Sequence, residues 1–134
     1  MRLGALFFIA VSLAGAPAAR AAERVLNIEA EILGPKEKSL GKTHLLVAAR
    51  GTERTKAELG GITLVLDADV GPTFDKDCNL VTVSGRLEDS DVEGKPRKRE
   101  LTRTTIHACG NGTKPTTLAG GGIHQVVVTI RPAS

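Results

Sequence analysis

Apolar and polar residues alternate with a period of two over most of this chain, which is typical of strands that bury one face. In the first such segment, residues 26–32, Leu26 and Ile28 lie on a face that contains only apolar residues. Five further segments have the same character, namely residues 43–50, 62–70, 80–88, 99–109 and 123–131. A short seventh strand is predicted within residues 113–118. The chain is therefore expected to be all-β.

A helix is predicted only in residues 52–59, where Thr55 and Glu58 have capping-box spacing and Gly60 can end one or two turns. Short strands joined by turns that contain Gly and Pro favour a small β-sandwich of six to seven antiparallel strands over a small barrel. An immunoglobulin-like topology is one alternative, although the Trp and Tyr that mark antibody-type domains are absent from the sequence.

The fourth and fifth strands are predicted to form one hairpin. If Glu88 pairs with Arg99 across a loop of residues 89–98, Val81 lies opposite Ile106 on the apolar face. A slip of one residue would turn one strand's apolar set to the wrong face. The matching of apolar residues therefore selects this register.

The same register places Cys78 opposite Cys109, on the more polar face beside Leu80 and His107. These are the only two cysteines, and we expect them to form a disulfide in an oxidising compartment. The closed loop of about 32 residues would stabilise the fold by about 3.5–4 kcal/mol through the entropy of the unfolded chain.

The inward faces of these strands predict an aliphatic core. It comprises Leu26, Ile28, Leu64, Leu66, Val81, Val83, Leu87, Ile106, Val126, Val128 and Ile130.

Residues 1–22 have the pattern of a secretory signal peptide, with Arg2, an apolar run of about eleven residues and small residues that end at Ala22. The run is shorter than the roughly 20 residues that a membrane helix needs. We therefore expect a single exported domain of residues 23–134, periplasmic or secreted, with no membrane insertion after cleavage.

The composition of residues 23–134 disfavours nucleic acid as a partner. Loss of Arg2 and Arg20 leaves 16 basic and 15 acidic side chains, so the net charge is close to +1 rather than the +3 of the whole chain. A nucleic-acid-binding domain usually has a basic face. Phe74 is the only aromatic residue of this part of the chain, so stacking platforms for bases are also absent.

The predicted hairpin loop and its flanks contain a block of acidic residues followed by a block of basic residues. These candidate interaction residues are Glu88, Asp89, Asp91, Glu93, Lys95, Arg97, Lys98 and Arg99. One interpretation is a charged recognition tip or a calcium site. The alternative is a solvated hairpin end whose opposite charges neutralise each other.

Four aspartates around the Gly-Pro turn at positions 71 and 72 are weak candidates for a metal site: Asp67, Asp69, Asp75 and Asp77. They do not fit an EF-hand, because Cys78 stands where position 12 requires a Glu. The three histidines, His44, His107 and His124, match no ligand motif. Three strands could bring them together, but the favoured interpretation is surface or strand-edge residues without a ligand.

No catalytic motif is found, and no cofactor is expected. The Gly-rich stretch of residues 110–122 precedes a strand, not a helix, and so does not fit a phosphate cradle. The favoured function is a non-enzymatic module that binds another exported protein, as an assembly factor, an inhibitor or an adhesion accessory. A metal- or small-ligand-binding protein is the alternative, and a small secreted hydrolase is third. The sequence does not indicate the oligomeric state.

Overall fold

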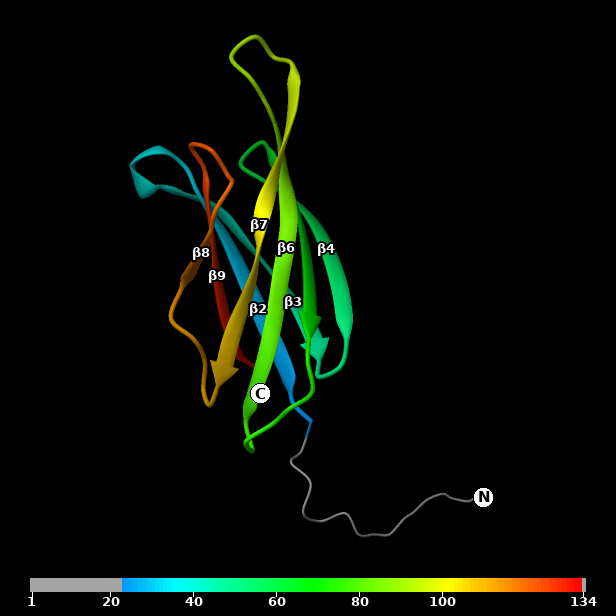
Figure 1. Cartoon of the computed structure of the whole chain (residues 1–134). Helices are drawn as coiled ribbons and strands as arrows, with labels where there is room; N and C mark the ends of the chain where they lie inside the picture. The colour runs from blue at the N-terminus through cyan, green and yellow to red at the C-terminus, as the bar shows by residue number, and fades with distance from the viewer. Residues whose placement is uncertain (1–22, 134) are drawn as a thin grey trace.

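Two antiparallel sheets of four strands form the protein in a computed structural model that describes residues 23–133 (Figure 1). One sheet has the order β3-β2-β9-β8, and the other has the order β4-β5-β6-β7. The strands are β2 (Val25–Leu33), β3 (Ser39–Ala48), β4 (Thr52–Leu59), β5 (Ile62–Val70), β6 (Cys78–Ser90), β7 (Pro96–Cys109), β8 (Thr116–Leu118) and β9 (Gln125–Pro132). A short 3-10 helix, η1 (Pro35–Glu37), lies between β2 and β3. The predicted signal peptide of residues 1–22 lies outside the described residues.

The strands follow one another as a meander. Each strand pairs with a neighbour in the chain, and the pairing of β2 with β9 brings the two ends of the domain together. The chain crosses from one sheet to the other after β3 and crosses back after β7. This order lacks the Greek-key connections of the immunoglobulin fold. The predicted all-β sandwich is therefore confirmed with a meander topology, and it has eight strands rather than the predicted six to seven.

The predicted short helix of residues 52–59 is wrong, because this segment is strand β4. It pairs along its whole length with β5, from Thr52 opposite Asp69 to Leu59 opposite Ile62. Gly60 and Gly61 have φ angles of 59° and 82° and form the two-residue turn between the strands. Such a turn requires positive φ at both positions, which glycine adopts without strain. The Gly-Gly pair was therefore a hairpin signal rather than a helix stop.

The aliphatic core is confirmed. All eleven predicted members are buried, and Val126, Val128 and Ile130 of β9 are completely inaccessible to solvent. They pack between the sheets with further residues such as Leu45, Leu101 and Leu118. Because burial of such side chains is the main favourable term in folding, this core fixes how the two sheets lie on each other.

The predicted register of the β6–β7 hairpin is confirmed from the Cys78–Cys109 pair to the Val83–Thr104 pair. Cys78 pairs with Cys109 and is joined to it by a disulfide, with the Cα atoms 4.0 Å apart. Above Val83 the register shifts at a β-bulge, so that Glu88 pairs with Lys98 and not with the predicted Arg99. The bulge places two residues of β7 opposite one of β6. This shift turns Leu101, which would otherwise face outward, into the core.

Candidate interaction site at one end of the sandwich

Four strand connections lie together at one end of the sandwich: β2–β3, β4–β5, β6–β7 and β8–β9 (Figure 1). The β6–β7 hairpin extends beyond the other three (Figure 1). Pairing with β5 stops at Glu88, whereas pairing between β6 and β7 continues to Ser90 and Pro96. We call residues 89–98 the hairpin arm. The sequence predicted a loop here, and the structure has a two-stranded arm with a turn of residues 91–95.

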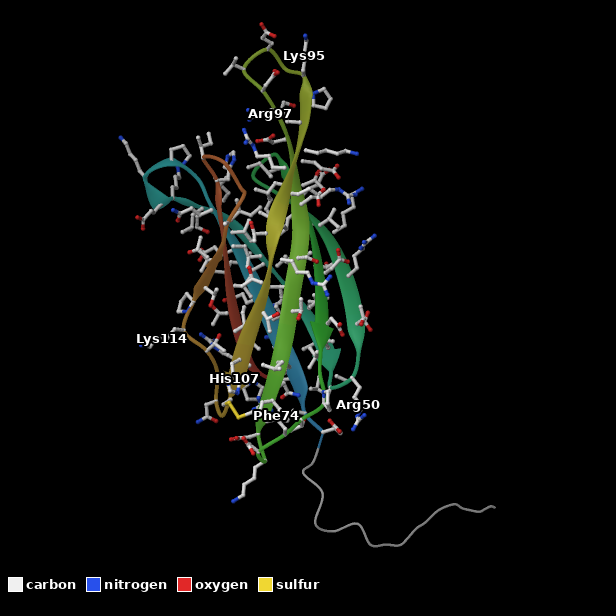
Figure 2. All side chains as sticks on the ribbon, in the orientation of Figure 1. Arg50, Phe74, Lys95, Arg97, His107 and Lys114 are labelled. Atoms are coloured by element: carbon white, nitrogen blue, oxygen red, sulfur yellow. A yellow bond between two sulfur atoms is a disulfide. The ribbon has the colours of Figure 1, made fainter. Side chains whose placement is uncertain are left out.

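An ion pair between Asp89 and Arg97 joins the two strands of the arm; Figure 2 labels Arg97 near its tip. The Nε and Nη2 atoms of Arg97 donate to Oδ1 and Oδ2 of Asp89 at 3.2 and 3.1 Å. Only 6% of the Asp89 side chain is exposed. Bidentate pairs of this kind fix the relative orientation of both side chains. The arm is therefore ordered beyond the end of β5.

Asp91 holds the tip of the arm in one conformation. Its Oδ1 atom accepts hydrogen bonds from the backbone N–H groups of Glu93 and Lys95 at 2.8 and 2.9 Å. Gly94 has a φ of 83° and completes the turn. Within residues 23–133, the Val92 side chain is fully exposed. The tip thus presents an apolar side chain on a defined backbone.

A cleft of about 520 Å³ lies between the arm and the neighbouring connections. Its walls are formed by Pro35, Leu40, Gly60, Gly61, Ile62, Asp89, Ser90, Asp91, Val92, Arg97, Ile123 and His124. The Nδ1 atom of His124 is buried and lies 3.7 Å from Oδ2 of Asp89, beyond hydrogen-bond distance. Ile123 beside it is 67% exposed. The β8–β9 connection therefore contributes the apolar side chain of Ile123 and the imidazole of His124 to the cleft beside the arm.

The acidic residues of the predicted charged blocks do not gather into one site at the arm. Glu88 accepts a hydrogen bond from Nε of Arg86 at 2.7 Å, and this contact lowers the pKa of Glu88. The Asp89 carboxylate accepts hydrogen bonds from Arg97, and the Asp91 carboxylate accepts hydrogen bonds from backbone N–H groups of the turn. Their oxygens therefore do not form a calcium-binding group in the described part of the chain.

The remaining charged candidates are divided between the surface and the interior. Glu93 and Lys95 are exposed and 4.0 Å apart, and Lys98 is also exposed. The Arg99 guanidinium packs so close to Gly122 that a side chain there would collide with it. Its Nε atom is buried and has no partner within residues 23–133. Lys95 and Lys98 are thus the basic side chains of the arm that are available to a partner.

The four aspartates suggested as a metal site do not form a ligand group. Asp67 and Asp69 lie on β5, where Asp67 accepts hydrogen bonds from Arg54 and Asp69 accepts one from Thr52. Asp75 and Asp77 lie in the β5–β6 connection. Within residues 23–133, one group of three candidate ligands has its atoms within 4.8 Å of one another, and it contains none of these aspartates.

The three histidines lie in separate places. His44 borders a shallow depression with Asn27 and Leu46, whereas His124 lies in the cleft beside the arm. His107 stacks on Phe74, with the ring centroids 5.5 Å apart. Sequence reasoning did not place His124 beside Asp89, because the two are 35 positions apart and only the packing of the two sheets brings them together.

The opposite end of the sandwich contains Arg24, which the sequence did not indicate as important. Its side chain donates to Oδ1 of the fully buried Asn79 and to the carbonyl oxygens of Ala108 and Gly110. Asn79 in turn donates to the carbonyl oxygen of Gly71. This network fastens the start of β2 to the ends of β6 and β7.

Comparisons with protein-family models, curated proteins and solved structures found no match to this chain. Among residues 23–133, no helix has the length and apolar character needed to cross a membrane. The Cys78–Cys109 disulfide is compatible with an oxidising location outside the cytoplasm.

Proposed function

We propose that this protein is a non-enzymatic exported module, periplasmic or secreted, that binds another exported protein through the hairpin arm and the β8–β9 connection. The observation that carries the proposal is the full exposure of Val92 on an arm held by the Asp89–Arg97 ion pair. A large apolar side chain on an ordered projection contributes nothing to the core. Its burial against a partner would remove apolar surface from water.

The order of the arm also favours binding. Association costs less conformational entropy when the contacting segment already has its bound conformation. The side chain of Asp91 and the Asp89–Arg97 pair supply that order here. Ile123 extends the apolar surface across the cleft, whose walls also include the polar residues Ser90 and Asp91. This combination of an apolar centre and a polar rim resembles other protein interfaces.

Site-specific photo-crosslinking in the native host tests the proposal. A photoreactive residue is placed at position 92, and the exported fraction is illuminated. We expect a discrete crosslinked product with a second exported protein. The same residue at position 46 is the matched control, because Leu46 is 62% exposed on β3, outside the cleft. Equal products from both positions, or none from position 92, would contradict the proposal.

A binding measurement with the captured protein then tests the contribution of the two apolar residues. The variant V92D/I123D should bind at least about tenfold more weakly, because an interface centre tolerates charge poorly. L46D should bind like the wild type. Both variants alter exposed positions, so their circular dichroism and thermal midpoints should remain close to those of the wild type.

A further inference from the structure

We propose that the outer face of β6 and β7 carries a redox-gated site for a soft metal ion, formed by Cys78, Cys109 and His107 when the disulfide is reduced. This site lies at the end of the sandwich opposite the arm (Figure 2). It goes beyond the proposed protein-binding function and does not depend on it.

Strand geometry gathers the three ligands. Cys78 lies directly opposite Cys109, and His107 precedes Cys109 by two positions on the same strand. Side chains two residues apart on a strand share a face. The two sulfur atoms and a ring nitrogen of His107 all lie within 4.8 Å of one another. Thiolates bound to one tetrahedral Zn²⁺ are about 3.8 Å apart, given Zn–S bonds of about 2.3 Å. Opposed strand positions can hold that separation with small side-chain rotations.

Phe74 holds the imidazole in place. The backbone groups of Phe74 and Cys78 exchange two hydrogen bonds, of 2.8 and 2.9 Å, so the β5–β6 connection folds back beside the disulfide. The Phe74 ring then stacks on His107 with an interplanar angle of 23°. Figure 2 shows both rings near the yellow disulfide. The only aromatic residue among those described therefore orients the candidate metal ligand.

The gating step is the reduction of the disulfide by a thiol reductant. The S–S bond takes up two electrons and two protons and becomes two thiols, while two reductant thiols become a disulfide. The metal ion then displaces the two thiol protons and binds both thiolates. Cys109 is exposed, so a reductant can reach it. The oxidised form lacks thiolates and should not bind the ion.

The ligand set selects soft d¹⁰ ions. Thiolates favour Cu⁺ and Zn²⁺ over hard cations, and imidazole suits both. Three protein ligands complete a trigonal site for Cu⁺ and leave one position for water on Zn²⁺. The two ions share the same site chemistry, so parallel titrations are needed to distinguish them.

Anaerobic titration of the purified protein tests the site. Reduced and oxidised samples are titrated with Co²⁺, whose thiolate charge-transfer absorption reports sulfur ligation, and Zn²⁺ or Cu⁺ then compete. We expect one equivalent per reduced chain and none per oxidised chain. H107Q should weaken binding at least about tenfold, whereas H44Q, on the other sheet, should leave it unchanged. Equal binding by H107Q and the wild type, or by both redox forms, would overturn the proposal.

A folding measurement excludes binding by an unfolded chain. Metal bound only to the folded state raises the thermal midpoint of the reduced protein. We expect such an increase for the reduced wild type and none for C78S/C109S. If the reduced chain is unfolded both with and without the metal, the site does not exist in the folded protein and the proposal fails.

Discussion

Asp89 and Arg97 lie at opposed positions of β6 and β7, and their ion pair stands just beyond the point where pairing of β6 with β5 ends. The Asp89 carboxylate is nearly inaccessible to solvent, while the Arg97 side chain is 35% exposed. The guanidinium also donates to the carbonyl oxygen of Ser90 at 3.4 Å. The stability of the fold depends on the pairing of Asp89 with Arg97, because a buried carboxylate without a neighbouring cation destabilises the folded state.

Arg97→Met should therefore lower the free energy of unfolding by about 1–3 kcal/mol, since it keeps the apolar stem but leaves Asp89 without its cation. Urea denaturation measures the effect. Arg54→Met is the control, because Arg54 makes a similar bidentate pair with Asp67 but is 65% exposed. It should cost clearly less than Arg97→Met, because solvent screens an exposed ion pair. Equal losses would mean that burial of Asp89 does not matter.

The structural role of Arg97 changes how the charge of the arm should be tested. Reversal of Lys95 and Lys98 alone leaves the ion pair intact. K95E/K98E should slow association with an acidic partner and reverse its salt dependence, with little change in the dissociation rate, because exposed charges act mainly on encounter. Stopped-flow or surface-based kinetics at several salt concentrations measure this. K114E, on the β7–β8 connection, is the control with the same type of change.

Arg24 should be essential to the stability of the end opposite the arm. Arg24→Met removes donors to Asn79, Ala108 and Gly110, which leaves acceptors without partners in a partly buried region. We expect the free energy of unfolding to fall by about 2–4 kcal/mol. Arg24→Lys should rescue little, because an ammonium group cannot reproduce the planar set of donors. Full rescue by Lys would show that charge alone is sufficient.

The sequence was sufficient to predict the features that depend on period and pairing. Alternation gave the core strands, and the matching of Val81 with Ile106 gave the register that also joins the cysteines. The sequence also contained a sign of the bulge, because Leu101 and Ile106 are both apolar yet five positions apart, an odd spacing, and both face the core. A strict period of two cannot place both on one face.

Other features could not be predicted because they depend on contacts between distant segments. The pairing of β4 with β5 is not of this kind, because the Gly60-Gly61 turn between these strands signals it locally. His124 approaches Asp89 only through the stacking of the two sheets. Arg24 is a lone cation in the sequence, and nothing in its neighbours indicates that it reaches three acceptors at the far end of β6 and β7.

Stability should decrease in acid through Glu23 and Glu88. The backbone N–H of Thr73 lowers the pKa of Glu23, and the Arg86 side chain lowers that of Glu88, from an ordinary value of 4.5. Because both pKa values are lower in the folded state, their contribution is complete above about pH 5 and is lost as the pH falls through the folded values. E23Q/E88Q should show a flatter dependence of unfolding free energy on pH in that range. An unchanged slope would exclude these two carboxylates.

Gly85 should be the least replaceable glycine of the sheets. It lies on β6 between Leu66 of β5 and Leu101 of β7, next to the bulge. A Cβ atom there would collide with the carbonyl oxygen of Val65 and lie 3.2 Å from the Cα of Leu66, and neither is a flexible side chain that could move aside. The two central strands would have to separate, which breaks hydrogen bonds and packing together.

Gly85→Ala should therefore lower the free energy of unfolding by about 2–4 kcal/mol, at the upper end of the range for overpacking, because only backbone atoms can relieve the collision. Gly71→Ala is the matched control. A Cβ at Gly71 meets only the carbonyl oxygen of Leu80, at 3.4 Å, and its φ is not positive. It should change stability by less than about 1 kcal/mol. Urea denaturation of both variants measures the difference, and a Gly85→Ala protein as stable as Gly71→Ala would show that β5 and β6 are not as closely spaced as described here.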